Sequence, residues 1–123
     1  PGSLYTSILP NLMVPGIVDA ISESKGIKYY ICNVATEIGE TQHFNVVKHI
    51  DVLESYLGPG ILDMIIANDN IGSIGKQFRG EAVDPNTGST KHLIAASDLL
   101  DEEHKVRHDS DKLAKFIMRN YLE

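Results

Sequence analysis

The sequence predicts an α/β fold in which a parallel sheet lies between layers of helices. Two short apolar runs, residues 27–34 and 61–68, are rich in β-branched side chains and lack polar alternation, as parallel strands covered on both faces do. A segment with helical spacing separates them, so strand, helix and strand form a right-handed crossover. The opening turn at residues 2–7 is of a kind that normally follows a strand. We therefore expect an incomplete domain that begins inside a βα unit.

Composition and charge restrict the class of protein. The chain has 123 residues, of which 42% are apolar and 23% charged, as in a single globular domain. Its net charge of −6 argues against nucleic acid and anionic membranes as partners, because both bind basic surfaces. Cys32 is the only cysteine, so a disulfide framework and a thiolate zinc site are excluded and an intracellular protein is expected. No leader is visible and the apolar runs are too short to span a bilayer, so we expect a soluble protein.

The N-terminal region is expected to form two helices. Apolar residues recur with helical spacing over residues 4–13, but two prolines forbid one straight helix. A kink at residues 14–16 is therefore predicted, followed by a second helix that runs to Ser24. The second helix is expected to bury a stripe formed by Ile17, Ala20 and Ile21.

The rest of the chain supplies two more helices and one more strand. Asn45 is predicted to cap a helix whose apolar positions follow helical spacing. Residues 69–79 are expected to be a turn-rich loop with a short helix or irregular piece, and residues 92–96 a third, weaker strand. Asp109 or Ser110 then caps a terminal helix with one apolar face. No internal repeat or linker divides the chain, so one domain is predicted.

Loops that follow strands are the candidate sites, because ligands of open parallel sheets bind beyond the carboxyl ends of the strands. In the opening turn, a glycine allows close approach of the backbone and hydroxyl groups add donors at a helix start, where unpaired N–H groups attract anions. The candidate residues for an anion or nucleotide there are Gly2, Ser3, Thr6 and Ser7. Plain helix capping is the alternative.

A second candidate is the polar loop at residues 33–44, which is longer and more polar than a minimal connection needs to be. It either binds a ligand or only caps the next helix through Glu40, Thr41 and Asn45, and one loop can do both. The segment from Asn68 to Asn70 ends the second strand with groups that can bind a base or ribose or form an ordinary turn.

Other reactive side chains carry weaker signals. The five histidines show no metal-binding spacing and are expected at the surface, and no triad pattern surrounds the hydroxyls of the opening turn. Cys32 lies in an apolar run and is expected to be a buried small hydrophobe. Arg107 can bind a phosphate, or it can form a surface pair beside a helix-capping Asp109.

Short motifs follow one another along the chain, namely residues 2–7, Pro10-Asn11-Leu12, Pro15-Gly16-Ile17, Cys32-Asn33-Val34 with Thr36, Gly39-Glu40-Thr41, Asp98-Leu99, and Arg107-His108-Asp109 with Lys112-Leu113-Ala114. In this combination and order, they resemble the motifs of the gluconeogenesis factor family, the uridine diphosphate sugar-binding proteins of bacterial cell-shape control, which are related to 2-phospho-L-lactate transferase in the CofD-like superfamily. The resemblance implies a cytoplasmic, Rossmann-like protein. Residues 1–123 would be the C-terminal portion of its domain, without the Gly-rich N-terminal half.

The resemblance also implies a ligand, a nucleotide or nucleotide sugar, and we expect a homo-oligomer with no nucleic-acid or membrane partner. The phosphate loop and second wall of the cleft would be formed by Gly2, Ser3, Tyr5, Thr6, Ser7, Asn33, Thr36, Gly39, Glu40 and Thr41, with Asn68 at lower weight. The family usually has Asp-Gly where this chain has Gln42-His43, so no metal ligand is expected in that loop.

Two alternatives accompany this interpretation. The first is an enzyme resembling 2-phospho-L-lactate transferase, which would use Mg²⁺ to transfer a phospholactyl group from a nucleotide-activated donor to a deazaflavin alcohol. Its catalytic residues are unassigned in this sequence. The second is a chain that folds as half of a domain and has no binding competence alone.

Overall fold

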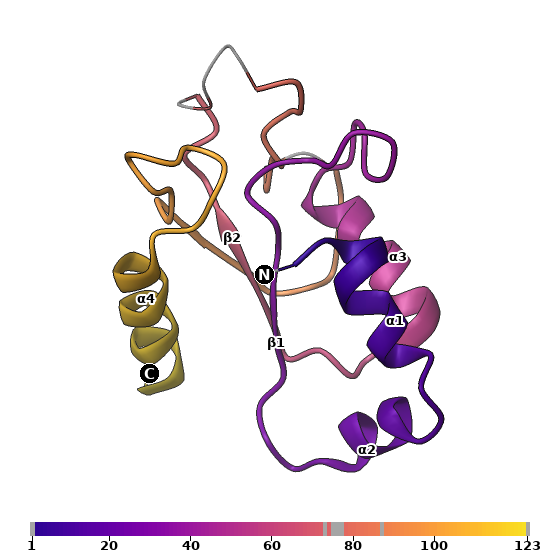
Figure 1. Cartoon of the computed structure of the whole chain (residues 1–123). Helices are drawn as coiled ribbons and strands as arrows, with labels where there is room; N and C mark the ends of the chain where they lie inside the picture. Colours follow the sequence, from indigo (N-terminus) through magenta and orange to yellow (C-terminus); the bar gives the residue numbers. More distant parts are fainter. Residues whose placement is uncertain (1, 73, 75–77, 87, 123) are drawn as a thin grey trace.

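The computed structural model describes residues 2–72, 74, 78–86 and 88–122, which form an α/β structure around a three-stranded sheet (Figure 1). The strands are β1 (Tyr29–Ile31), β2 (Met64–Asn68) and β3 (Ile94–Ser97). They lie in the order β1-β2-β3, and both neighbouring pairs are parallel. The predicted α/β class and parallel sheet are confirmed.

Helices cover both faces of this sheet. They are a π-helical turn (Leu4–Ile8) that continues into α1 (Leu9–Leu12), followed by α2 (Ile17–Glu23), α3 (Val46–Leu57) and α4 (Ser110–Leu122). Figure 1 shows α1 and α3 together on one side of the strands and α4 on the other, which makes three layers. Of the predicted irregular piece at residues 69–79, residues 73 and 75–77 lie outside the described residues.

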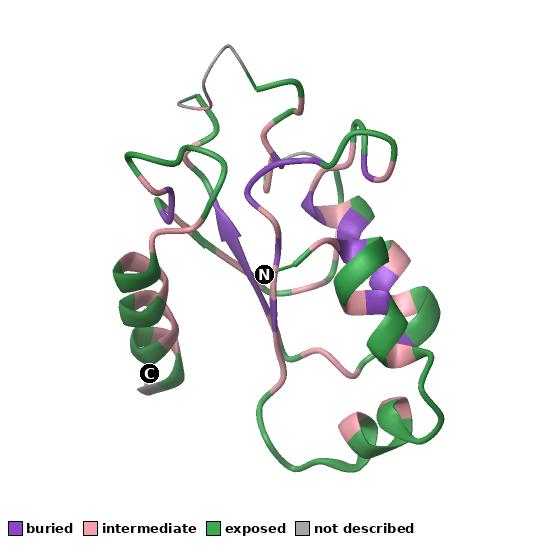
Figure 2. Ribbon diagram, viewed as in Figure 1, coloured by how far each residue is buried: buried purple, intermediate pink, exposed green. Residues whose placement is uncertain are grey.

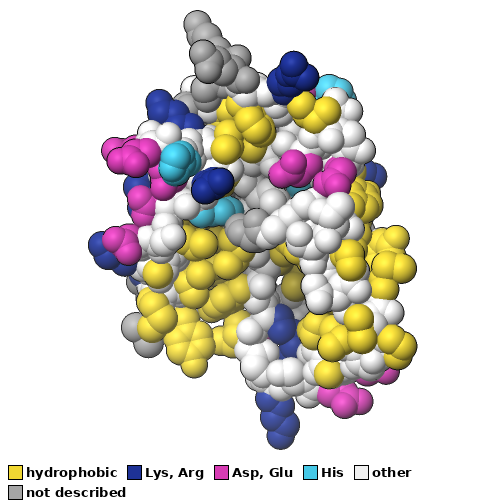
Figure 3. All heavy atoms as spheres, in the orientation of Figure 1, with side chains coloured by type: hydrophobic (Ala, Val, Ile, Leu, Met, Phe, Trp, Pro, Cys, Tyr) yellow, Lys and Arg dark blue, Asp and Glu magenta, His cyan; other side chains and the backbone are white. Residues whose placement is uncertain are grey.

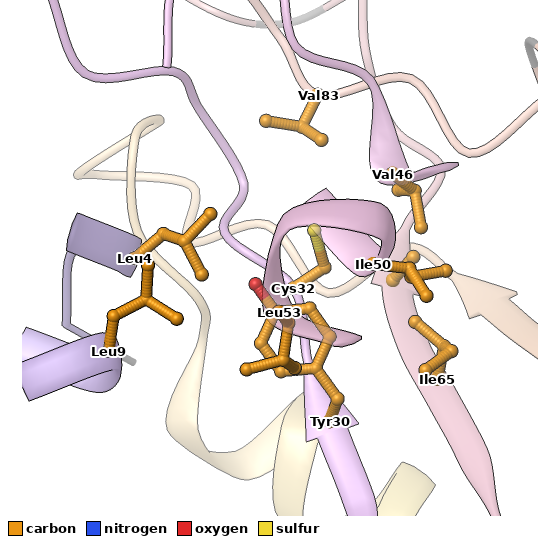
Figure 4. Packing of buried hydrophobic residues seen from close by; sticks show 10 residues of the cluster. Leu4, Leu9, Tyr30, Cys32, Val46, Ile50, Leu53, Ile65 and Val83 are labelled. Atoms are coloured by element: carbon orange, nitrogen blue, oxygen red, sulfur yellow. The ribbon is translucent and has the colours of Figure 1, made fainter. Parts of the chain in front are cut away.

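The main core joins α3 and the N-terminal helices to one face of the sheet. Side chains alternate along a strand, so Ile65 and Ala67 of β2 belong to this core while the buried Ile66 between them faces the side of α4. Figure 4 shows how the cluster packs, with Leu4 and Leu9 directed toward the α3 residues and the first strand. The opening turn is thus anchored to the core through Leu4, which is 1% exposed.

The predicted packing of α2 is wrong. None of its residues is buried, and Ile17 of the expected stripe is 38% exposed (Figure 2). Gly16, with φ of 89°, begins α2 after the turn at Pro15, and the axes of Leu4–Leu12 and Ile17–Glu23 differ by 78°. The change of direction carries α2 away from the core. Within the described residues, no single helix has the length and hydropathy to cross a membrane. The segments Leu4–Leu12 and Ile17–Glu23 meet these two criteria only when they are counted as one bent span.

Candidate functional site

The opening turn and the loop at residues 33–44 lie side by side at the carboxyl end of β1. The side-chain amide of Asn33 donates to the carbonyl of Gly2 at 3.2 Å, and the hydroxyl of Ser3 donates to the carboxylate of Glu40 at 2.5 Å. The rings of Tyr5 and Phe44 meet edge to face, with centroids 6.4 Å apart. Residues that the sequence places in two separate candidate sites therefore form one surface.

The start of the first helix differs from a simple phosphate loop. The carbonyl of Ser3 accepts from the N–H groups of Ser7 at 2.9 Å and Ile8 at 3.0 Å, which makes a π-helical turn. The Ser3 side chain does not cap this turn but holds the carboxylate of Glu40 beside it, a favourable position for a negative charge. A Cβ at Gly2 would lie 2.5 Å from Cβ of Ser7, so only glycine fits.

Three predicted site residues are buried supports. Thr36, Thr41 and Asn68 are each at most 2% exposed. The Thr41 hydroxyl accepts from the N–H of Glu37 at 2.7 Å, and the side-chain Oδ1 of Asn68 accepts from the N–H of Leu99 at 3.0 Å. These side chains hold loops in place, and the ordinary-turn interpretation of Asn68 is the one that its contacts support. Gly39, with φ of 82°, likewise serves a turn.

The loop after β1 is joined to a segment that the sequence did not connect with it. The backbone N–H of Thr36 donates to the backbone carbonyl of Glu81 at 2.8 Å. In return, the backbone N–H of Glu81 donates to the side-chain hydroxyl of Thr36 at 2.8 Å. Val83 donates to the carbonyl of Val34 at 3.0 Å. This antiparallel pairing brings residues 78–83 to the carboxyl end of β1.

A pocket of about 500 Å³ opens there, between the loop after β1 and the start of α4. Its lining residues are Asn33, Val34, Ala35, Glu37, Phe78, Val106, Arg107, His108, Ser110 and Leu113. In Figure 3, basic, histidine and hydrophobic side chains gather in the upper part of this face, and acidic side chains lie to the left and to the right of them. Of the residues that the resemblance implies as the binding site, only Asn33 lines this pocket. Arg107, which its sequence makes a candidate for phosphate binding, lines it too.

Two buried polar atoms at the pocket have no hydrogen-bond partner among the described residues, namely Oδ1 of Asn33 and Nε2 of His108. Burial lowers the pKa of His108, and a hydrogen bond with the backbone of Cys32 opposes this shift only in part. The imidazole is therefore neutral at neutral pH. Both atoms can bond polar groups of a ligand, beside the permanent charge of Arg107.

The predicted surface location of the histidines is wrong for His49, which is fully buried. Its Nδ1 donates to the carbonyl of Asn45 at 2.8 Å, and its ring contacts that of Phe44 edge to face at 5.5 Å. Burial lowers the pKa of His49. Cys32 is buried as predicted, and burial raises the pKa of its thiol to about 12, so the thiol is unreactive.

The capping interpretation of Asp109 is confirmed. Its carboxylate accepts from the N–H of Lys112 at 2.9 Å in the first turn of α4. No group of three or more His, Cys, Asp or Glu side chains that could hold a metal ion occurs in the part of the chain that the structure describes.

Residues 1–120 match the family model described as 2-phospho-L-lactate transferase CofD. The chain belongs to the CofD family. Its relatives include proteins described as gluconeogenesis factor from Bacillus subtilis (strain 168) and Halalkalibacterium halodurans, each 35% identical over 127 residues and 96% of this chain. A relative from Thermotoga maritima is 39% identical over 131 residues, 97% of this chain and 41% of its own length.

Solved structures agree with this membership in the CofD family. The crystal structure of a UPF0052 family protein from Bacillus halodurans has a TM-score of 0.83 and 32% identity, and the match covers 96% of this chain and 41% of that chain. The Bacillus subtilis and Halalkalibacterium halodurans relatives are covered over 40% and 39% of their lengths. The chain thus spans about two fifths of the length of the relatives that it matches.

Proposed function

We propose that this protein binds a nucleotide sugar of the uridine diphosphate class. It would act as a cytoplasmic regulatory protein of the gluconeogenesis factor type, linking carbon metabolism to cell-wall and cell-shape control. The observation that carries the proposal is the pocket at the carboxyl end of β1, which combines Arg107 with the amide of Asn33 next to the opening turn. The relatives described as gluconeogenesis factor support only the part of the proposal that assigns the protein to the gluconeogenesis factor type. A homo-oligomer is part of the proposal.

The chemistry of the pocket suits a diphosphate joined to polar rings. A guanidinium binds phosphate oxygens through paired hydrogen bonds, so Arg107 is assigned to the diphosphate. The glycine-containing turn at residues 2–7 does not line the pocket but is joined to it by the bond between Asn33 and Gly2, and we assign its backbone N–H groups a second contact with the diphosphate. Glu40 must release the hydroxyl of Ser3 for an anion to approach, because two negative groups at one helix start repel each other.

Calorimetry on the full-length protein with uridine diphosphate glucose tests the proposal. The wild type should bind, and its melting temperature should rise with ligand concentration, since the ligand binds only the folded state. Arg107→Ala should weaken binding about tenfold or more, because a charged hydrogen bond is worth about 1.5–3 kcal/mol. Arg119→Ala on the exposed side of α4 is the matched control and should bind as the wild type does. Absence of a thermal shift at millimolar ligand would contradict the proposal.

A second candidate function is group transfer, which the description of the family model favours. The described residues do not fit a metal ion held by the protein, so no metal step is assigned to them. If the protein is a transferase, turnover should need added Mg²⁺, and Ser3→Ala or Thr6→Ala should abolish it with folding intact. Nucleotide-sugar binding with no turnover in the wild type would exclude this candidate.

A further inference from the structure

We infer that the open edge of β3 is a docking site for an extended, acidic peptide segment of a partner protein. This inference goes beyond the proposed nucleotide-sugar function and does not depend on it. Among the described residues β3 pairs only with β2, so its other edge carries no strand. A strand with an unpaired edge is a template for the backbone of another segment, which adds to the sheet through main-chain hydrogen bonds.

Two residues of β3 direct their backbone groups to this open edge. The carbonyl of Leu93 accepts from the N–H of Ile65 in β2 at 2.9 Å. Alternate residues of a strand bond the same neighbour, so Ala95 faces β2 as well. The N–H and carbonyl groups of Ile94 and Ala96 therefore point the other way, where no described residue bonds them.

The sequence of β3 lacks the residues that normally protect an edge strand. Lysine and proline at an edge discourage pairing with other chains, whereas β3 consists of Ile-Ala-Ala-Ser. Ala96 is exposed, and its small side chain allows a second backbone to approach. Leu93, which directly precedes the strand, is 61% exposed and extends its apolar character. The edge is therefore suited to pairing.

The charge at the end of β3 selects an acidic partner. A cavity of about 210 Å³ lies between this strand end and α4, and its lining consists of residues 97–99 with Lys112, Lys115, Phe116 and Arg119. Lys112 pairs with Asp98 at 3.3 Å. Lys115 and Arg119 are exposed and have no ion-pair partner among the described residues. Two such cations beside an open edge favour a docked segment that carries carboxylates.

The two faces of the sheet predict the pattern of the docked segment. Successive side chains of a strand point to opposite faces, so every second side chain of an added strand is directed toward α4 and its basic groups. The side chains between them face the side of α3, where Ile94 packs against the main core. The segment is therefore expected to alternate acidic and apolar residues.

A second copy of this chain fits the edge less well than an acidic segment does. Antiparallel pairing of two β3 strands would bring the exposed Lys91 of each copy toward the basic side chains at the end of the other β3. Like charges brought together at an interface disfavour association. A segment with carboxylates replaces this repulsion with attraction.

Fluorescence polarisation of a labelled peptide tests the inference on the full-length protein. The probe is a strand-length peptide of about eight residues in which glutamate and valine alternate. The wild type should bind it, and a peptide with lysine in place of glutamate should bind about tenfold or more weakly. Methylation of the backbone nitrogens of the glutamate peptide keeps its charges but removes its donors, and it should also weaken binding about tenfold or more.

Two variants of the protein separate the edge from the charge. Ala96→Pro removes an N–H that faces the open edge and no bond to β2, so it should weaken binding about tenfold or more and leave the circular dichroism spectrum unchanged. Lys115→Glu should weaken binding about threefold or more at low salt. Lys25→Glu makes the same change of charge at an exposed position after α2 and should bind as the wild type does.

Four results would overturn the inference. The first is a wild type that does not bind the glutamate peptide at millimolar concentration. The second and third are equal binding of the lysine peptide, which removes the role of charge, and of the methylated peptide, which removes strand pairing. The fourth is a wild-type oligomer that Ala96→Pro converts to monomers in sedimentation velocity without any peptide binding, since the occupant would then be a second copy. If Ala96→Pro fails to fold, Lys115→Glu and the methylated peptide still decide the question.

Discussion

At the scale of one residue, the carboxylate of Glu40 is a candidate ligand contact and also makes a hydrogen bond within the fold. The loop motif makes it a candidate for the second wall of the cleft, and its carboxylate accepts from Ser3 at the helix start that the same motif assigns to phosphate. The side chain is thus placed where a bound anion would compete with it. Ligand binding and the Ser3–Glu40 bond are therefore mutually exclusive in the proposed mechanism.

Thr36 gives a test of the buried support beneath the site. Thr36→Val keeps the shape of the side chain but removes the buried hydroxyl that accepts from Glu81, and it leaves the part-buried N–H of Glu81 without its acceptor. The free energy of unfolding should fall by about 1–3 kcal/mol. Chemical denaturation of the variant checks this value. Thr6→Val, the same change at an exposed position, is the control and should cost less. Equal costs would show that the bond to Glu81 does not stabilise the protein.

His49 makes stability depend on pH. Burial lowers its folded-state pKa, whereas an unfolded imidazole has a pKa of about 6.5. The unfolded state therefore binds a proton first, and stability should fall as the pH drops below about 6.5. Unfolding free energies at a series of pH values should show a smaller decline for His49→Gln than for the wild type. The exposed His104→Gln should follow the wild type, and an unchanged decline in His49→Gln would be inconsistent with this assignment.

At the scale of elements, α3 is the clearest case of a local signal. Asn45 caps it, with Oδ1 accepting from the N–H of Lys48 at 2.8 Å, and Gly58 ends it with φ of 94°. Both ends and the apolar spacing are contained in consecutive residues. The prediction from sequence could therefore be made without knowledge of the fold.

The cap of α3 should be worth a measurable part of the stability. Asn45→Ala should lower the free energy of unfolding by about 0.5–2 kcal/mol, because the N–H of Lys48 loses its acceptor. Asn45→Asp keeps an acceptor and serves as the control that should preserve stability. Urea titration followed by circular dichroism measures both variants. If the alanine and aspartate variants unfold at the same urea concentration, the cap contributes nothing.

The parts of the site that sequence reasoning missed depend on contacts between distant residues. The pairing of Thr36 with Glu81 crosses 45 positions, and the bond from Leu99 to Asn68 crosses 31. Neither leaves a local pattern, so Phe78 was not recognised as a pocket residue and Asn68 was given a ligand role. The same limitation explains α2, whose apolar spacing predicted burial while the turn at Gly16 carried it away from the core. The site roles of Gly2, Ser3, Tyr5, Thr6, Ser7, Gly39 and Glu40 stay predictions.

At the scale of the whole molecule, the described residues leave both edges of the sheet open. β1 and β3 each pair only with β2, and large apolar side chains such as Met13 at 69% and Leu93 at 61% exposure lie at the surface. Unpaired strand edges favour association with other chains. The candidate pocket lies at the carboxyl end of β1, with Asn33 in its lining.

Residues 1–123 expressed alone should therefore self-associate, whereas the full-length protein should form a defined species. Sedimentation velocity over a range of concentrations compares the two. Association of the shorter chain should weaken when a charged residue replaces an apolar residue at the open edge, as in Ile31→Lys. A monodisperse chain of 123 residues that unfolds cooperatively would show that these edges need no cover.

The central claim is that a nucleotide sugar binds at the carboxyl end of β1. A crystal structure of the full-length protein with uridine diphosphate glucose tests it most directly. The account predicts a diphosphate within hydrogen-bond distance of Arg107 and of the turn at residues 2–7, and a broken Ser3–Glu40 bond. A ligand bound away from these residues, with the bond between Ser3 and Glu40 intact, would contradict it.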